Sequence, residues 1–171
     1  MTIIVQSFEF LPEIMKYCIE KEMTDEKGIL KDVNTFIPIR YQEAVVDEPV
    51  IWMSQHPSRA DRQADISQTM DLITPFEFDC AVYERDLEDA EKASQNLTMR
   101  VIAAIRLNYL EAQKEIVGGR IIRRIGLETY TPVGEVQING KSDRLPATGV
   151  ILNIVHTINW DVCCKKLKGD D

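Results

Sequence analysis

The longest regular pattern in the chain is an alternation of apolar and polar residues from 66 to 82. Every second residue is mostly apolar, as at Leu72, Phe76 and Phe78, whereas acidic or small polar residues fill most positions between them. Side chains of a strand point alternately to its two faces, so the pattern predicts a long strand with one buried face and one wet, acidic face. Proline cannot donate to a strand ladder, and we expect a kink at Pro75.

At Asp86 the pattern changes to a helical period. Asp86 is the expected N-cap, and acidic residues follow it in the first turn, where the helix dipole favours negative charge. Apolar residues then recur at helical spacing until Gly118 and Gly119, which are typical of the position just past a helix end. We therefore predict one long amphipathic helix, from Asp86 to Val117, packed on the apolar face of the preceding strand.

The first third of the chain contains shorter elements. Apolar residues recur at helical spacing over 7–23, which predicts an amphipathic helix capped by Ser7 with Pro12 in its first turn. Residues 36–41 read as a short edge strand, because they include a proline. The compact apolar run 50–53 is typical of a buried strand.

The last third of the chain is β-like. Residues 121–130 predict a strand with Ile121, Ile125 and Leu127 on one face, and the Asn139-Gly140 pair is a strong hairpin signal because both residues tolerate positive φ. Alternation over 149–163 predicts the final strand. These elements indicate an α+β fold with a mixed or antiparallel sheet of long strands, on which one long amphipathic helix and an N-terminal helix pack.

The length is that of a single domain, 1–171, with two excursions at 54–64 and 131–148. The stretch from Ser54 to Ala64 has no apolar periodicity and predicts a surface loop, which is either a partner contact or a solvated loop without a role. Its guanidinium groups suit the carboxylates of a partner. The candidate partner-contact residues are Arg59, Arg62, Asn139 and Gly140.

Charge and cysteine content narrow the functional class. The net charge of −8 argues against a broad nucleic-acid surface, and no apolar run is long enough for a membrane span, so we expect a cytosolic protein. The four cysteines show no CxxC spacing, and Cys18 and Cys80 fall on apolar faces, which favours buried free thiols over disulfides. Neither of the two histidines, His56 and His156, has ligand-like spacing to a cysteine or to the other histidine, so zinc is not expected.

Motifs of catalysis are missing from the sequence. It contains no glycine-rich phosphate loop, nucleophile elbow or HExxH helix. His156 lies on the apolar face of the last strand, where a satisfied core or interface histidine is favoured over a catalytic base. We predict a protein that is not an enzyme and has no catalytic residues, cofactor or metal.

Two stretches connect this pattern to a known family. A strand over 68–83 ends in Phe-Glu-Phe-Asp-Cys-Ala-Val-Tyr before an acidic helix start, and a closing strand over 149–160 follows the Tyr-Thr-Pro turn at 130–132. In these stretches and in its order of elements, the chain resembles the tail terminator, or tail completion, proteins of long-tailed bacteriophages. The resemblance covers nearly the whole chain as a pattern of elements.

The resemblance implies a virion protein at the head–tail junction, made in the host cytoplasm. It implies a homo-oligomeric ring, of six subunits, that caps the tail tube protein, joins the head connector protein and lets DNA pass in transit, with no membrane partner. Six copies would carry a net charge of about 6 × −8 = −48, which disfavours binding of DNA phosphates to the wall of the channel. The alternatives are another neck or tail component, such as a head–tail connector or tube protein, or a small cytosolic ligand-binding domain or enzyme with His156 in a pocket.

Overall fold

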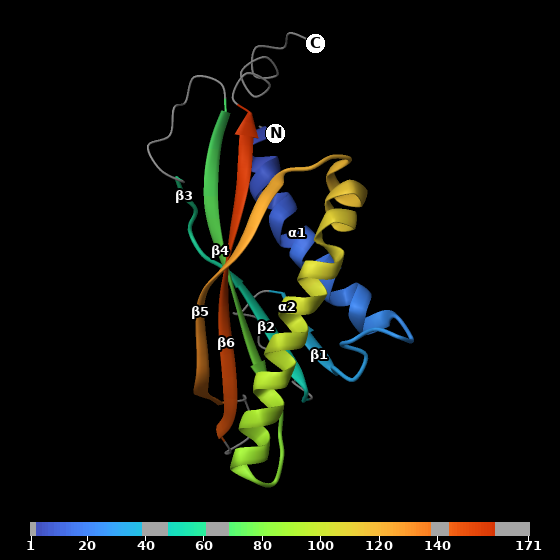
Figure 1. Ribbon diagram of the computed structural model, residues 1–171, viewed down its shortest axis with the longest axis vertical. Helices are drawn as coiled ribbons and strands as arrows, with labels where there is room; N and C mark the ends of the chain where they lie inside the picture. The colour runs from blue at the N-terminus through green and yellow to red at the C-terminus, as the bar shows by residue number, and fades with distance from the viewer. Residues whose placement is uncertain (1–2, 39–47, 61–68, 138–143, 160–171) are drawn as a thin grey trace.

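The computed structural model describes residues 3–38, 48–60, 69–137 and 144–159 (Figure 1). Its elements are α1 (Ile3–Thr24), β1 (Thr35–Ile37), β2 (Val50–Gln55), β3 (Arg59–Ala60), β4 (Thr69–Ala81), α2 (Leu87–Val117), β5 (Ile122–Gln137) and β6 (Arg144–Asn159). The strands form one sheet in the order β1-β2-β4-β6-β5, and β3 also pairs with β4. All pairs are antiparallel except β1 with β2. The predicted α+β fold is confirmed.

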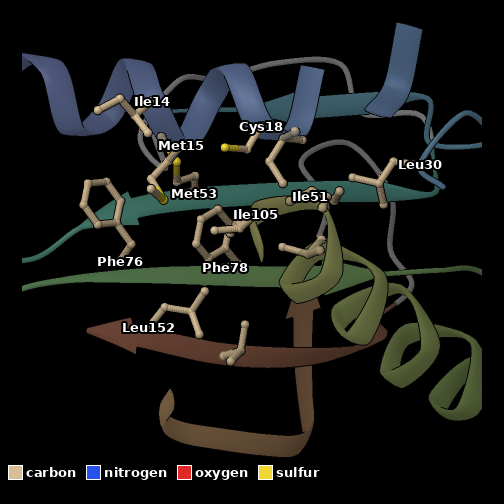
Figure 2. Packing of buried hydrophobic residues seen from close by; sticks show 14 of the residues in the cluster. Ile14, Met15, Cys18, Leu30, Ile51, Met53, Phe76, Phe78, Ile105 and Leu152 are labelled. Atoms are coloured by element: carbon tan, nitrogen blue, oxygen red, sulfur yellow. The ribbon is translucent and has the colours of Figure 1, made fainter. Parts of the chain in front are cut away.

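The main core lies between the two helices and one face of the sheet (Figure 2). Phe76 and Phe78 of β4 are fully buried, and they pair across the strands with Leu152 and Val150 of β6. The alternation in the sequence therefore marks the face of the sheet that the helices cover. The buried residues of α1 that meet this face include Leu11, Ile14, Met15, Cys18 and Ile19.

Local signals set both ends of α2. The Asp86 carboxylate accepts from the backbone N–H groups of Glu88 at 2.9 Å and Asp89 at 3.3 Å, which satisfies donors left open at the helix start. Gly118 adopts the left-handed conformation with φ of 73°, and its N–H donates to the Lys114 carbonyl at 3.0 Å. A residue with a side chain would be strained there, so the predicted cap and stop are confirmed.

Polar side chains connect α2 to the end of α1 and to the segment that follows α1. Asn108 of α2 donates to the Glu22 carboxylate at 2.8 Å, and the same carboxylate accepts from the Ile29 N–H at 3.0 Å. Arg100 donates to both oxygens of Asp32, at 2.6 and 3.1 Å, in the forked geometry that suits guanidinium and carboxylate. These hydrogen bonds lower the pKa of Asp32 below its usual range. The two helices are therefore fixed to each other by buried contacts and by this polar junction.

The start of α1 differs from the prediction. The helix begins at Ile3, so Ser7 is not its cap and Pro12 lies inside it rather than in its first turn. The helical spacing of apolar residues continues upstream of Ser7, as Ile4 and Phe8 show, and an interior proline removes only one backbone hydrogen bond. A polar residue within a helical pattern was mistaken for its boundary.

The predicted loop at 54–64 is partly sheet. Ser54 and Gln55 belong to β2, and β3 follows at 59–60, because backbone pairing with β4 needs no alternation of side chains. Residues 61–64 lie outside the described part of the chain. Strand β4 continues through Pro75, whose carbonyl accepts from the His56 N–H at 2.9 Å. The backbone position at which Pro75 lacks an N–H therefore faces the gap between β2 and β3. Few strand hydrogen bonds are lost there.

Whereas the sequence predicted a strand at 121–130, a separate hairpin arm at 131–148 and a final strand at 149–163, strands β5 and β6 pair with each other along most of their length. Each contains 16 residues, so the strand expected at 121–130 and the arm beyond it are one continuous element. Three register shifts interrupt the pairing of β5, which are typical of β-bulges. The predicted turn at Asn139-Gly140 and the predicted strand end at 160–163 lie outside the described residues.

Candidate partner-contact surfaces

The predicted contact residues are only partly placed. Arg59 lies in β3, where its guanidinium contacts the Glu128 carboxylate of β5 at 3.4 Å while remaining 55% exposed. An ion pair this exposed contributes little to stability. Arg59 therefore has a partner within its own chain, although its exposure leaves it accessible. Arg62, Asn139 and Gly140 lie outside the described residues, so their predicted contacts stay predictions.

His156 belongs to a buried polar chain rather than to an open pocket. Its Nε2 lies 2.9 Å from the Thr74 hydroxyl, which in turn lies 2.6 Å from the Ser58 hydroxyl. Both His156 and Thr74 are fully buried. Burial lowers the pKa of His156 to about 4, and the nearby Asp71 only partly opposes that shift. The imidazole is therefore neutral at physiological pH, and the predicted core position of His156 is confirmed.

The two cysteines that the structure places are buried and free, as predicted. Burial raises the pKa of both Cys18 and Cys80 to about 12, so neither thiol is ionised at physiological pH. Cys163 and Cys164 lie outside the described residues. Within the described ranges, no group of three or more His, Cys, Asp or Glu side chains is placed to hold a metal ion. Neither α1 nor α2 contains an apolar stretch that could cross a membrane.

A groove of about 460 Å³ separates the C-terminal half of α2 from the first half of β5. We call it the α2–β5 groove. Its apolar lining comes from Ile102, Ile105, Tyr109, Ile125, Leu127 and Leu152. Three arginines, Arg106, Arg123 and Arg124, also line it, so the groove combines an apolar floor with positive charge. The sequence contains three arginines just after the long helix, at 120, 123 and 124, but no sequence signal places Arg106 beside them.

The groove exists because the helices do not cover all of the sheet. Leu127 and Leu152 are cross-strand partners, yet Leu127 is 61% exposed and Leu152 is buried. The helical cover therefore ends between β6 and β5. Gln113 holds the start of β5 beside α2, because its side-chain oxygen accepts from the N–H groups of Ile121 at 2.9 Å and Ile122 at 2.6 Å.

A second surface lies at the opposite end of α2. We call residues 83–92 the α2 start. Tyr83 and Leu87 are large hydrophobic residues, yet both are exposed there, Leu87 to 70%. Five carboxylates and two cations surround them in the sequence, which gives this end of the helix a net negative charge. Exposed apolar residues that gather in one place are typical of interaction sites.

The outer edge of β5 is a third candidate surface. Strand β5 is the last in the sheet order, and among the described strands it pairs only with β6. No other described strand pairs with its outer edge, which is 16 residues long. Such edges are templates for pairing with another chain unless a protein blunts them, and the bulges of β5 do so in part.

Comparison with known proteins adds no name to these surfaces. A scan against protein-family models finds no matching family, and a search of curated proteins finds no matching protein.

Proposed function

We propose that this chain is a virion structural protein that forms a closed ring of six subunits at the head-proximal end of a bacteriophage tail. In this role the ring caps the tail tube protein, joins the head connector protein and lets DNA pass through its centre. The resemblance in the order of elements suggested the role. The described surfaces support it because they provide contacts for other chains and no arrangement that resembles an active site.

The observation that carries the proposal is the uncovered side of the sheet at β5. Strand β5 is a 16-residue edge strand that includes exposed Leu127 and has an open groove beside it. These features leave apolar and hydrogen-bonding surface that the described part of one subunit does not cover. A neighbouring subunit would satisfy both kinds of surface at once. The α2 start provides a second, different surface at the other end of the same helix, as a head-to-tail ring requires.

Charge fits the same role. A channel lined by subunits of net charge −8 disfavours retention of phosphate groups, which suits DNA in transit. The same charge makes subunits repel each other in free solution. We therefore expect the free protein to remain monomeric in dilute solution until the end of a tail tube templates the ring. A monomer in dilute solution would not contradict the proposal.

The test is an image of the assembled virion in which this chain is located. Copies in a single ring at the head-proximal end of the tail would support the proposal. Copies repeated along the whole tail would make the chain a tube subunit instead. If the chain were found outside every particle, the structural role would be wrong.

A further inference from the structure

We propose that the α2–β5 groove receives the α2 start of a second copy of this chain, in a head-to-tail contact. The inference rests on the proposed function, because it names the contact that joins neighbouring subunits of the ring. It is argued from the chemistry of the two surfaces. Both belong to the described part of the chain.

The groove selects an occupant that is apolar and negatively charged. Its floor is formed by aliphatic and aromatic side chains, so the buried part of an occupant must be apolar. Arg123 already contacts Asp71 at 3.1 Å. Arg106 is exposed, and the described residues provide no ion-pair partner for it. An acidic group beside an apolar side chain would complete this site.

The α2 start has this composition. Leu87, 70% exposed, is the most exposed large apolar residue in the described part of the chain. Within residues 84–92, five carboxylates outnumber two cations, and Lys92 is already paired with Glu88 at 2.6 Å. Glu91 lies one helical turn after Leu87 on the same face of α2. Its carboxylate accepts from the Gln95 side chain at 3.2 Å, and the described residues provide no ion-pair partner for it. Leu87 therefore offers the apolar group and Glu91 the charge that the groove lacks.

The groove cannot take the α2 start of its own chain. Leu87 and Ile105 belong to one continuous helix and are 18 residues apart, which separates them by about 27 Å at the helical rise per residue. The occupant must therefore come from another copy. Since the two surfaces are different, each subunit donates one and accepts with the other, and such heterologous contacts generate rings when the rotation closes.

The first test is a cross-linking experiment on the full-length protein. The photoreactive amino acid p-benzoylphenylalanine replaces Leu87, and the unlabelled variant is mixed at high concentration with ¹⁵N-labelled wild-type protein. Mass spectrometry then locates the linked peptides. We expect links from position 87 to residues 102–109 or 123–127 of the labelled copy. Links to other surfaces, or no link between copies, would overturn the proposal.

Charge reversal provides the second test. We expect R106E in the labelled chain, or E91K in the photoreactive chain, to reduce the cross-linked product about fivefold or more, because each places like charges across the contact. E91K in the photoreactive chain together with R106E in the labelled chain restores the yield. The matched controls K114E and E115K reverse exposed charges on the same helix outside the groove and leave the yield unchanged. Equal losses in the controls, or no rescue, would contradict the assigned pair.

The two proposals can fail separately. If the virion image shows one ring but the groove makes no link to position 87, the function stands and the contact is wrong. If the links and the charge rescue are observed but the chain lies outside every particle, the contact stands and the tail role is wrong. Circular dichroism and melting of every variant establish that each is folded before it is compared.

Discussion

His156 makes the folding free energy depend on pH. Its pKa is about 6.5 in an unfolded chain and about 4 in the folded protein, where burial disfavours the charged form. Because the folded pKa is lowered, the neutral imidazole contributes stability that is complete above the unfolded pKa. That contribution is lost as the pH falls from about 6.5 to about 4.

The size of the effect follows from linkage. A shift from 6.5 to about 4 corresponds to about 3 kcal/mol in the free energy of unfolding. Most of this stabilisation is lost in the first part of the fall in pH. We therefore expect the wild type to lose about 2 kcal/mol of unfolding free energy between about pH 7 and about pH 5 from His156 alone. Carboxylates whose pKa is lowered, such as Asp32, contribute their own loss at more acidic pH.

The assay is urea denaturation of the wild type and of one histidine variant across this range. His156→Gln removes the titration and keeps an amide that can reach the Thr74 hydroxyl. We expect this variant to have a lower free energy of unfolding than the wild type at neutral pH. We also expect its free energy of unfolding to depend less on pH. The same slope in wild type and His156→Gln would refute the reasoning.

Three further substitutions test the packing. Phe78→Ala removes a fully buried aromatic ring, and we expect chemical denaturation to show a loss of about 3–5 kcal/mol; an unchanged midpoint would place the ring outside the core. Gln113→Leu leaves two backbone N–H groups at the start of β5 without their acceptor, which should cost about 1–3 kcal/mol in the same assay. Gly28→Ala places a Cβ 2.0 Å from the Glu22 carbonyl oxygen and should lower the melting temperature, whereas the control Gly119→Ala meets nothing within 4 Å; equal melting of the two variants would contradict the close approach.

The parts of the fold that were predicted correctly have local causes. The cap at Asp86 and the stop at Gly118 depend on residues within one turn, so both ends of α2 can be read from the sequence. The core face of β4 follows from the alternation of apolar and polar residues, because Leu72, Phe76, Phe78 and Cys80 on one side of the strand are buried. The start of α1 was missed because serine can cap a helix or lie within one, and the sequence alone does not decide between them.

The groove could not be predicted, because pairing across strands decides which face of β5 each residue occupies. Register shifts between Ile122 and Arg124, and again between Leu127 and Thr129, break the alternation on which the prediction relied. The sequence placed Ile121 with Ile125 and Leu127 on one face. In the structure Ile122, rather than Ile121, is paired with buried His156, as Ile125 is with Ile154 and Leu127 with Leu152.

The exposure of Leu127 connects this irregular strand to the proposed ring. Its partner Leu152 lies under the helices, and full burial of a leucine stabilises a protein by about 1.5–3 kcal/mol relative to its exposed state. A single chain forgoes much of that gain at Leu127 and also at Leu87. If the α2 start of one copy enters the α2–β5 groove of the next, both side chains leave water in the same contact. Each subunit then covers the part of its neighbour's sheet that the neighbour's own helices leave exposed. The stabilisation from burying Leu127 and Leu87 is obtained in every subunit only when the ring closes.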